Sequence, residues 1–351
     1  MTTDTIALPD LGWGPFYQSQ LTIDEFETTQ PVRISGVHRT AIDVLASDGP
    51  SRVNTTPDFT SADLTVGDWL LIDQATGDPV RLLDRKSLLQ RMAAGTDTST
   101  QLIAANIDTL FIVTSCNADF NIARLERYLA LAHQAEVEPV IILTKPDLCD
   151  DPDAFLDQAR EGMPNTLVEL VNAKSSDAVA QLAPWCGKGQ TVALLGSSGV
   201  GKSTLVNKLS GADQDTQGIR EDDARGRHTT TGRSLHRISG GGWLMDTPGM
   251  RSLRLYDLKD GVDAVFEDIV DLATTCKFSD CAHDTEPGCA VQNAIKAGDL
   301  DEGRLHRWQK LQREDARHAE TVAEQHAQSR KKQKHYATGK LRMKEKQRGL
   351  D

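Results

Sequence analysis

The apolar residues of this chain follow two rhythms, and the first is one of short runs broken by turns. Between residue 32 and about residue 85, strand-like apolar stretches cover residues 32–35, 41–45 and 69–73. The segments 47–50 and 76–79 combine Asp, Gly and Pro and predict turns. About five short strands of this kind favour a small β-barrel, most simply an OB-fold, which often binds oligonucleotides. A β-module that serves only as a scaffold remains an alternative.

The second rhythm alternates buried strands with amphipathic helices. Apolar runs at residues 109–114, 139–143, 167–171, 191–195 and 242–245 predict strands. Between the first two, residues 123–135 carry Leu125, Leu129 and Ala132 at helical spacing. Strands that alternate with helices predict a mostly parallel sheet.

The remaining segments divide the chain into five predicted parts. We expect a flexible leader over residues 1–30 with at most one short helix, an OB-fold domain over 31–100, and an α/β nucleotide domain over 101–262. The small, polar residues 92–101 predict a loop between the two domains. A helical domain follows over 263–326, with helices at 290–297 and from 300 to about 328, and a basic tail without stable structure covers 327–351.

Charge separates the tail from the body of the chain. The 351 residues carry a net charge of −12, yet residues 327–351 hold nine basic and two acidic residues, which leaves −19 for residues 1–326. A basic tail on an acidic body suggests a polyanionic partner for the tail. In the predicted barrel, Arg33, His38, Arg39, Arg85, Lys86 and Arg91 could follow a phosphate backbone, although single charges on strands more often form a solvated face.

The sequence predicts a cytoplasmic protein. It has no run of eighteen apolar residues, and its first residues lack the basic and apolar regions of a signal peptide. The six cysteines form one cluster of three, with Cys116, Cys149 and Cys186 scattered outside it, which is a poor disulfide framework. The three scattered residues are expected to be core thiols.

The stretch from Gly196 to Thr204, GSSGVGKST, fits the phosphate-binding P-loop G-x-x-x-x-G-K-[ST]. It follows a predicted strand and precedes a helical pattern that Gly211 would end, which is the context that the motif requires. Its backbone N–H groups would surround phosphates at a helix N-terminus. Lys202 would neutralise the β- and γ-phosphates, and Ser203 would bind Mg²⁺.

Two short motifs at predicted strand ends indicate a guanine base. Residues 144–147, TKPD, resemble the N/T-K-x-D motif of GTPases, in which Asp147 would accept hydrogen bonds from guanine N1–H and the exocyclic amine. Adenine lacks those donors, and leaving a buried carboxylate unpaired is costly. Residues 172–174, NAK, resemble the S/N-A-K element. Each motif alone is weak, but both follow strands at the edge where open α/β sheets bind ligands.

A third motif, residues 246–249 (DTPG), matches D-x-x-G after a predicted strand. Asp246 would hold Mg²⁺ through water, and the Gly249 N–H would contact the γ-phosphate. Between it and the P-loop, residues 225–231 (RGRHTTT) occupy the position of switch I, and one threonine, which we take as Thr230, would complete the Mg²⁺ shell. The predicted GTP-binding residues are Thr144, Lys145, Pro146, Asp147, Asn172, Ala173, Lys174, Gly196, Ser197, Ser198, Gly199, Val200, Gly201, Lys202, Ser203, Thr204, Asp246 and Gly249.

A second cluster predicts a metal site. Cys276, Cys281, His283 and Cys289 would form a closed tetrahedral Cys₃His shell with no open position. We therefore expect one structural zinc ion per chain that folds a small module. Unpaired buried cysteines are an improbable alternative at this density.

The order of the motifs is that of a circularly permuted GTPase. Most GTPases place the base-reading motifs after the P-loop, whereas here they precede it. In this order the chain resembles the ribosome small-subunit-dependent GTPase family (RsgA, also called YjeQ or EngC) from about residue 30 to 310. The Cys/His cluster looks like the zinc knuckle of that family. The resemblance implies an OB-like barrel, a permuted P-loop GTPase domain and a C-terminal zinc-knuckle helical domain.

Two positions depart from common GTPase patterns. Thr144 replaces the more usual Asn; its hydroxyl can still brace the P-loop, and guanine choice should survive because Asp147 carries it. Met250 stands where Ras-like enzymes carry a water-positioning Gln. The resemblance implies that a switch I histidine takes this role, which falls on His228. A histidine that merely packs or caps remains the alternative.

By resemblance, the protein is a GTP hydrolase that binds the small (30S) ribosomal subunit and its 16S rRNA. It would hydrolyse GTP in a ribosome-stimulated manner late in subunit assembly, with Mg²⁺ and zinc as cofactors. We expect GTP and GDP as ligands, a monomer, and no membrane partner. Two other classes stay open: a P-loop ATPase or small-molecule kinase, which predicts no guanine preference, and an RNA-binding scaffold with a vestigial nucleotide site.

Overall fold

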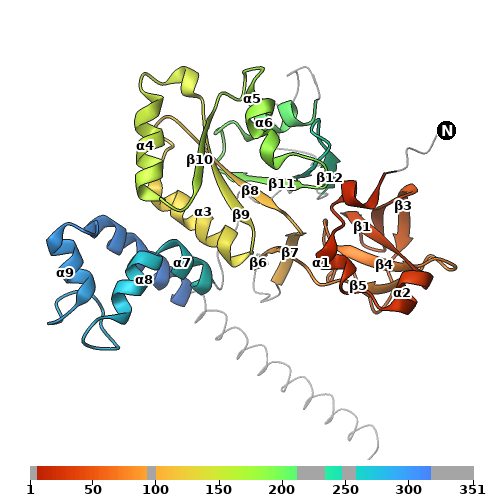
Figure 1. The fold of residues 1–351 in the computed structure, drawn as a ribbon, viewed down its shortest axis with the longest axis horizontal. Helices are drawn as coiled ribbons and strands as arrows, with labels where there is room; N and C mark the ends of the chain where they lie inside the picture. The colour runs from red at the N-terminus through yellow and green to blue at the C-terminus, as the bar shows by residue number, and fades with distance from the viewer. Residues whose placement is uncertain (1–5, 93–99, 212–233, 247–257, 318–351) are drawn as a thin grey trace, which may run out of the picture.

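The computed structural model describes residues 6–92, 100–211, 234–246 and 258–317. The chain forms an antiparallel sheet near its N-terminus, a central mostly parallel sheet with helices, and a set of helices at the C-terminal side (Figure 1). These three parts agree with the predicted OB-like, nucleotide-binding and helical regions.

Residues 6–28 pack against the N-terminal sheet, in contrast to the predicted flexible leader. They form η1 (Leu8–Leu11), α1 (Pro15–Gln18) and α2 (Ile23–Thr28). Leu11 and Tyr17 are buried, and the Trp13 ring contacts Trp69 edge to face. The buried aromatic and aliphatic side chains stabilise a segment whose polar composition suggested a loose chain.

Five antiparallel strands form the OB-like sheet. Its order is β3-β2-β1-β4-β5. The strands are β1 (Thr29–Val37), β2 (Ala41–Ala46), β3 (Gly49–Asn54), β4 (Trp69–Asp73) and β5 (Pro79–Leu82). Val32, Ile34, Val44 and Leu70 are fully buried in one core cluster, which explains the short alternating apolar runs. The predicted five-stranded module is confirmed.

A hairpin connects this sheet to the nucleotide-binding sheet. It consists of β6 (Leu88–Met92) and β7 (Thr100–Ala105), which pair antiparallel. The loop predicted over residues 92–101 therefore includes one end residue of β6 and the start of β7, and residues 93–99 lie outside the described residues.

The central sheet has six strands in the order β10-β9-β8-β11-β13-β12. They are β8 (Thr109–Ser115), β9 (Glu138–Thr144), β10 (Leu167–Val171), β11 (Thr191–Gly196), β12 (Ser234–Arg237) and β13 (Trp243–Asp246). All neighbours are parallel except β12 and β13. The connecting helices are α3 (Ile122–Gln134), η2 (Pro146–Leu148), α4 (Pro152–Gly162), α5 (Ala178–Leu182), η3 (Ala183–Trp185) and α6 (Lys202–Leu209).

Both faces of the central sheet are covered, as a parallel sheet requires. On β8, Leu110 and Ile112 belong to one core cluster, whereas Phe111 and Val113 belong to the other. The residues of β8 thus alternate between two cores, which accounts for the continuous apolar run in the sequence. The predicted α/β alternation is confirmed.

The C-terminal helices meet the central domain at α3, which the first and the last of them contact. They are α7 (Lys259–Val265), α8 (Glu267–Thr274), α9 (Ala290–Ala297) and a helix over residues 302–317. A Cβ atom on Gly261 of α7 would lie 2.0 Å from the Ala130 carbonyl oxygen, so only glycine permits this close crossing of α7 and α3. The helix predicted at 290–297 is confirmed, and residues 318–328 of the second predicted helix lie outside the described residues.

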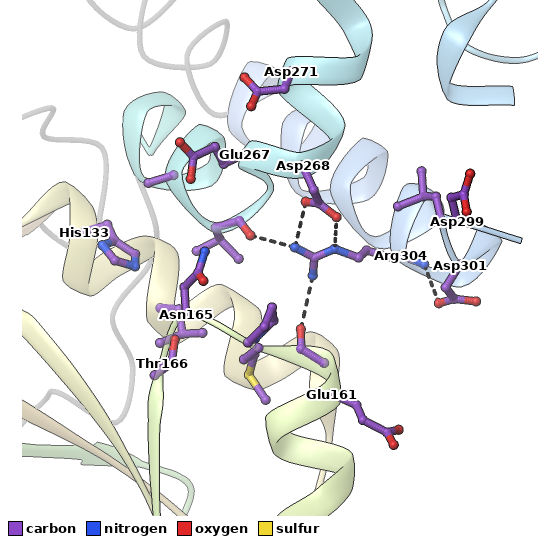
Figure 2. A pocket seen from close by; sticks show the side chains of 17 residues that line it. His133, Glu161, Asn165, Thr166, Glu267, Asp268, Asp271, Asp299, Asp301 and Arg304 are labelled. Carbon is purple, nitrogen blue, oxygen red and sulfur yellow. Dashed lines mark hydrogen bonds and ion pairs between the residues drawn. The ribbon is translucent and has the colours of Figure 1, made fainter. Parts of the chain in front are cut away.

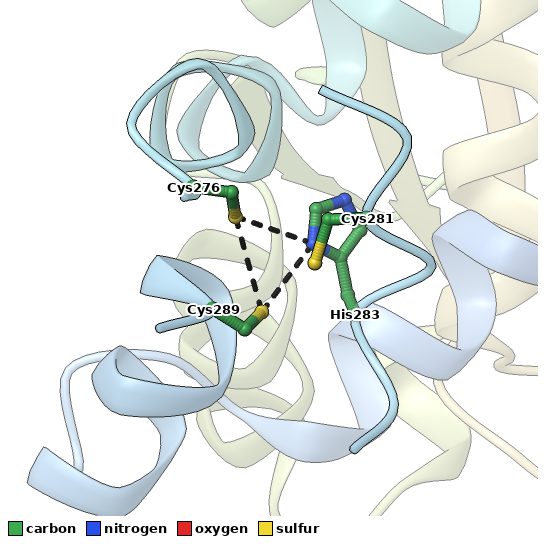
Figure 3. Close-up of side chains that lie close together, drawn as sticks. All are labelled: Cys276, Cys281, His283 and Cys289. Atoms are coloured by element: carbon green, nitrogen blue, oxygen red, sulfur yellow. Dashed lines mark hydrogen bonds between the residues drawn. The ribbon is translucent and has the colours of Figure 1, made fainter. Parts of the chain in front are cut away.

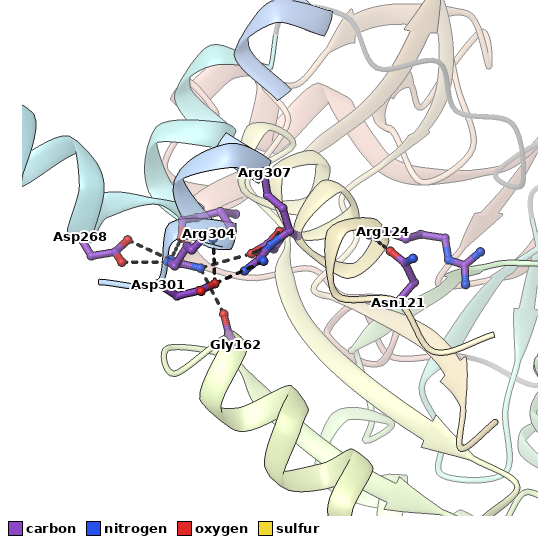
Figure 4. Close-up of polar contacts among 9 residues, drawn as sticks. Asn121, Arg124, Gly162, Asp268, Asp301, Arg304 and Arg307 are labelled. Carbon is purple, nitrogen blue, oxygen red and sulfur yellow. Dashed lines mark hydrogen bonds and ion pairs between the residues drawn. The ribbon is translucent and has the colours of Figure 1, made fainter. Parts of the chain in front are cut away.

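A buried ionic network joins the C-terminal helices to the central domain (Figure 4). Glu126 of α3 is fully buried and accepts hydrogen bonds from Arg307 at 2.8 Å and from Arg304 at 3.4 Å. Arg304 also pairs with Asp268 and donates to the Gly162 carbonyl at the end of α4. Burial raises the pKa of Glu126, and the hydrogen bond from Arg307 opposes that shift.

We expect Glu126→Gln to destabilise the protein by about 3 kcal/mol, because it removes the fully buried carboxylate that pairs with both Arg304 and Arg307. The measurement is the change in free energy of unfolding from urea titration. Glu314→Gln is the matched control, since its ion pair with Arg127 is one-third exposed and should contribute less than about 1 kcal/mol. Equal losses in the two variants would contradict the assignment.

Candidate nucleotide-binding site and metal cluster

The P-loop follows β11 and turns directly into α6, as its glycines require. Gly196, Gly199 and Gly201 have φ angles of 155°, 81° and 97°, a region that other residues rarely adopt. A Cβ on Gly196 would lie 2.1 Å from the Val113 carbonyl oxygen of the neighbouring strand. The first turn of α6 therefore begins at the sheet edge, where its free N–H groups and the helix dipole favour an anion.

The Lys202 side chain folds over this loop. Its Nζ donates to the Gly196 carbonyl at 2.8 Å and to that of Ser197. These carbonyls hold the ammonium within the turn that the P-loop backbone makes. A phosphate bound to the loop would meet this positive charge together with the backbone N–H groups.

Thr144 ties the first base motif to the P-loop. Its hydroxyl oxygen lies 2.5 Å from the Val200 carbonyl oxygen and 3.0 Å from that of Thr114, so the single hydroxyl proton can be donated to either. The side chain is fully buried. Thr144 thus contacts the P-loop in place of the Asn that is more usual in GTPases.

The residues after Thr144 turn sharply out of the sheet. Lys145 has a φ of 59°, in the left-handed region that is costly for a residue with a Cβ atom, and Asp147 is exposed in η2. Strained backbone of this kind clusters at binding sites. The turn places the Asp147 carboxylate at the sheet edge, where a ligand can reach it.

The second base motif lies beside the first. Val171, the last residue of β10, pairs with Thr144 in the parallel register. Asn172 Oδ1 accepts a hydrogen bond from the Lys174 N–H at 3.0 Å, which closes a tight turn around the buried Ala173. Because β10, β9, β8 and β11 are neighbours, both base motifs and the P-loop meet at the carboxyl edge of one sheet, where open α/β folds bind ligands.

Several predicted site residues lie wholly or partly outside the described residues. The backbone of β13 runs parallel to β11 and brings Asp246 to the same sheet edge, but its side chain is outside the described residues. The switch I segment with His228 and Thr230 and the segment with Gly249 and Met250 are also outside them.

The four predicted metal ligands converge in the C-terminal helices (Figure 3). Their ligand atoms all lie within 4.8 Å of one another, with Cys276 Sγ 3.9 Å from Cys289 Sγ and His283 Nδ1 3.6 and 3.5 Å from these two sulfurs. Tetrahedral zinc with Zn–S of about 2.3 Å and Zn–N of about 2.1 Å requires about 3.8 Å between sulfurs and about 3.6 Å between S and N. The donor set therefore fits zinc and could hold it.

The surroundings of the cluster are suited to thiolate ligands. The Ala290 and Gln292 N–H groups, in the first turn of α9, donate to the sulfurs of Cys276 and Cys289 at 3.3 and 3.4 Å. Gln292 also donates to the His283 carbonyl, and Trp308 is buried with its ring 5.6 Å from that of His283. Such outer contacts fix the orientation of metal ligands.

The cysteines outside the cluster have structural positions. Cys116 and Cys186 are buried as predicted, and burial raises their pKa values to about 11 and about 12. Cys149 is half-buried and packs against the main core. Neutral, buried thiols are poor nucleophiles and metal ligands.

Two arginines proposed to follow a phosphate backbone are structural instead. Arg33 is 1% exposed and bonds only within the protein interior. Arg85 forms a bidentate ion pair with the buried carboxylate of Asp68, with its Nε 2.7 Å from Asp68 Oδ1. Neither guanidinium can bind RNA without breaking these contacts, so that expectation is wrong for both residues.

A cavity of about 480 Å³ lies at the junction of the central domain and the C-terminal helices (Figure 2). Several carboxylates surround its one arginine, Arg304. Its described lining contains no residue of the P-loop or the base motifs, so the cavity is separate from the nucleotide site. Nothing in the sequence indicated it, because its walls come from four distant segments.

No helix within the described part of the chain is both long and apolar enough to cross a membrane.

A sequence model of the RsgA GTPase family matches residues 82–256, and a model of ABC transporters matches residues 183–343, which also contain the P-loop. Small ribosomal subunit biogenesis GTPase RsgA 2 of Vibrio parahaemolyticus is 50% identical over 324 residues, covering 92% of this chain and 90% of the relative. Small ribosomal subunit biogenesis GTPase RsgA of Mesorhizobium japonicum is 51% identical over 319 residues, covering 90% and 92%.

Two solved structures share the fold. YjeQ from Thermotoga maritima aligns with a TM-score of 0.59 and 24% identity over 81% of this chain and 97% of its own. YloQ, described as a circularly permuted GTPase, aligns with a TM-score of 0.60 and 25% identity over 82% and 95%. The two relatives share 50% and 51% of their residues with this chain over 92% and 90% of its length, and the chain has the permuted order of motifs. This protein therefore belongs to the RsgA GTPase family and is a GTP hydrolase with a circularly permuted nucleotide-binding domain.

Proposed function

We propose that this GTPase binds the small ribosomal subunit in its GTP form, hydrolyses GTP when the subunit stimulates it, and then leaves, during late maturation of that subunit. The observation that carries the proposal is the 50% identity, over 92% of the chain, to a relative named for small-subunit biogenesis. The protein would act in the cytoplasm as a monomer, with 16S rRNA as its main contact on the subunit.

The proposed domains would have separate functions, with RNA binding in the two outer domains and nucleotide binding in the central one. An OB-like domain up to about residue 100 and a zinc-helical domain over 263–326 flank the nucleotide domain over 101–262. The two outer domains would grip RNA while the switches report the γ-phosphate. The basic tail over 327–351, with its charge of +7, would add electrostatic attraction to phosphates.

The experiment that tests the proposal is cosedimentation with purified small subunits in GTP, GDP and a non-hydrolysable GTP analogue. Retention with GTP and the analogue but not with GDP supports the cycle, as does turnover that rises when subunits are added. Equal retention in all three states, without stimulated turnover, would leave a scaffold with a vestigial site.

In the nucleotide site, Asp147 would recognise guanine by accepting hydrogen bonds from N1–H and the exocyclic amine. The aliphatic part of Lys145 would lie over the base, and the Ala173 backbone would contact the guanine oxygen. The P-loop from Gly196 to Thr204 would hold the phosphates, with Lys202 at the β- and γ-positions and Gly249 at the γ-phosphate. Mg²⁺ would be bound by Ser203, Thr230 and, through water, Asp246. This set follows from the motifs and from the shared sheet edge.

Asp147→Asn should weaken GTP binding by about tenfold to a hundredfold, because the amide cannot accept both guanine N–H donors as a carboxylate can. Xanthine nucleotides should gain affinity in the variant, since their base offers an acceptor where guanine has the amine. Competition by GTP, ATP and XTP against a fluorescent nucleotide measures both effects. Equal affinity of the unmodified protein for ATP and GTP would contradict the guanine assignment and favour an ATPase or kinase.

At the metal cluster we propose one zinc ion per chain, held by Cys276, Cys281, His283 and Cys289. All four positions of a tetrahedral shell would be occupied by protein ligands, so the ion would have a structural role. The match between the ligand separations and tetrahedral zinc supports this proposal.

A further inference from the structure

A single buried arginine joins the N-terminal domain to the strand that leads into the P-loop. Arg33 Nη1, from β1, donates to the Leu11 carbonyl at 2.6 Å. Its Nη2 donates to the Asn106 carbonyl at 3.1 Å and to the Thr191 hydroxyl at 2.7 Å. Leu11 ends η1, Asn106 precedes β8, and Thr191 is the first residue of β11. One guanidinium thus connects the N-terminal helices, the interdomain connection and the P-loop strand.

Stability alone is a poor explanation for this arginine. Its acceptors are neutral, and among the described residues no carboxylate is hydrogen-bonded to it. The nearby Asp108 carboxylate instead accepts from the Thr191 N–H at 2.8 Å. A buried cation without a carboxylate partner is costly, and an apolar side chain of similar volume is often at least as stabilising. An apolar side chain could not form the three hydrogen bonds by which Arg33 links Leu11, Asn106 and Thr191.

A second hydrogen bond joins the N-terminal domain to β13, the strand next to β11. Trp243, the first residue of β13, donates from Nε1 to the Asp10 carbonyl at 2.7 Å. Thr191 and Trp243 are direct partners in the parallel register of β11 and β13. The N-terminal domain therefore holds two neighbouring strands at the same level, with one hydrogen bond to each.

The interface leaves little room for the domain to shift. A Cβ on Gly189, just before β11, would lie 2.3 Å from the Pro9 carbonyl oxygen, and one on Gly12 would lie 2.9 Å from the Gly189 carbonyl oxygen. Leu11 and Trp69 share one apolar cluster with Ala193 of the P-loop strand. A movement of either strand at its amino end must therefore move the contacts with the N-terminal domain.

The opposite ends of these two strands carry the nucleotide chemistry. β11 ends at Gly196, the first residue of the P-loop, and β13 ends at Asp246 of the D-x-x-G motif. We propose that Arg33 is a positioning residue: with Thr191 it couples the docking of the OB-like domain at the amino ends of β11 and β13 to nucleotide binding at their carboxyl ends. The coupling requires only GTP or GDP binding, and it is independent of the proposed ribosomal partner.

Hydrogen exchange of the full-length protein, with and without saturating GDP or a non-hydrolysable GTP analogue, tests the coupling. In the unmodified protein, nucleotide should slow exchange in peptides covering residues 8–13 by about fivefold or more, the lower range of coupling between sites. In Arg33→Met this nucleotide-dependent change should be lost, while nucleotide still binds. Arg33→Lys should keep part of it, because one ammonium can replace some of the three hydrogen bonds.

Two further variants separate coupling from folding. Thr191→Val keeps the shape and removes only the hydroxyl acceptor, so it should also reduce the change even if Arg33→Met fails to fold. Arg52→Met is the matched control, because Arg52 is an exposed arginine of the same domain that pairs with Asp43 at 2.7 Å, and it should retain the full change. The proposal is overturned if residues 8–13 do not respond to nucleotide in the unmodified protein. It is also overturned if Thr191→Val retains the full response.

Discussion

Replacing Cys276 or His283 with alanine is expected to abolish metal binding and to unfold the C-terminal segment around the cluster. Zinc binding contributes on the order of 10 kcal/mol or more to the folding of small zinc modules, which exceeds what a short segment gains from its own core. Residues 276–289 contain no helix or strand in the structure, so the four ligands are their main constraint. Subunit binding should be lost in both variants.

The nucleotide site should survive this change, because its P-loop and base motifs lie in the central sheet. We expect GTP and GDP affinities within about threefold of those of the unmodified protein, a difference of less than about 1 kcal/mol. Elemental analysis, hydrogen exchange over residues 276–300 and cosedimentation together measure the effect. Cys116→Ala is the control, since this buried thiol lies outside the cluster and its loss should leave zinc bound. Carefully purified protein with no zinc and a protected C-terminal segment would refute the structural role.

The features that can be predicted from the sequence are local ones. The P-loop motif is set by Gly196, Gly201 and Lys202 within one short loop, and the positive φ angles of the two glycines favour glycine there. Strand bounds such as 69–73 and 167–171 also follow from short apolar runs between turns, and the structure has the same bounds in β4 and β10. The four metal ligands fall within fourteen residues. In each case the determining contacts lie within one short window.

The features that could not be predicted from the sequence depend on contacts between distant segments. Val32, Arg33 and Ile34 are all buried, because β1 faces the barrel core on one side and the central domain on the other. An alternating pattern predicts a solvated arginine there, and only the packing of the two domains removes it from water. Glu126 is buried for the same reason, by arginines 178 and 181 residues away. Polar residues at domain interfaces carry no local pattern.

We expect His228 to position the water that attacks the γ-phosphate. Met250 stands where Ras-like enzymes carry glutamine, and a thioether is only a weak hydrogen-bond acceptor. Hydrolysis by the protein alone should therefore be slow. His228 precedes the threonine run of switch I, whose side chains would reach Mg²⁺ and the γ-phosphate, so closure of switch I on the small subunit would bring the imidazole to the water. Both residues lie outside the described part of the structure.

His228→Ala should lower subunit-stimulated turnover by roughly two to three orders of magnitude, the size of losing one positioned catalytic group. GTP affinity and subunit binding should change little, because phosphoryl transfer depends chiefly on positioning and charge stabilisation, which act at the transition state. His236→Ala is the control, since this histidine of β12 is exposed and its ring nitrogen hydrogen-bonds to Ser234. If stimulated turnover survives intact in His228→Ala, then Arg227, the ribosome or the backbone must position the water instead.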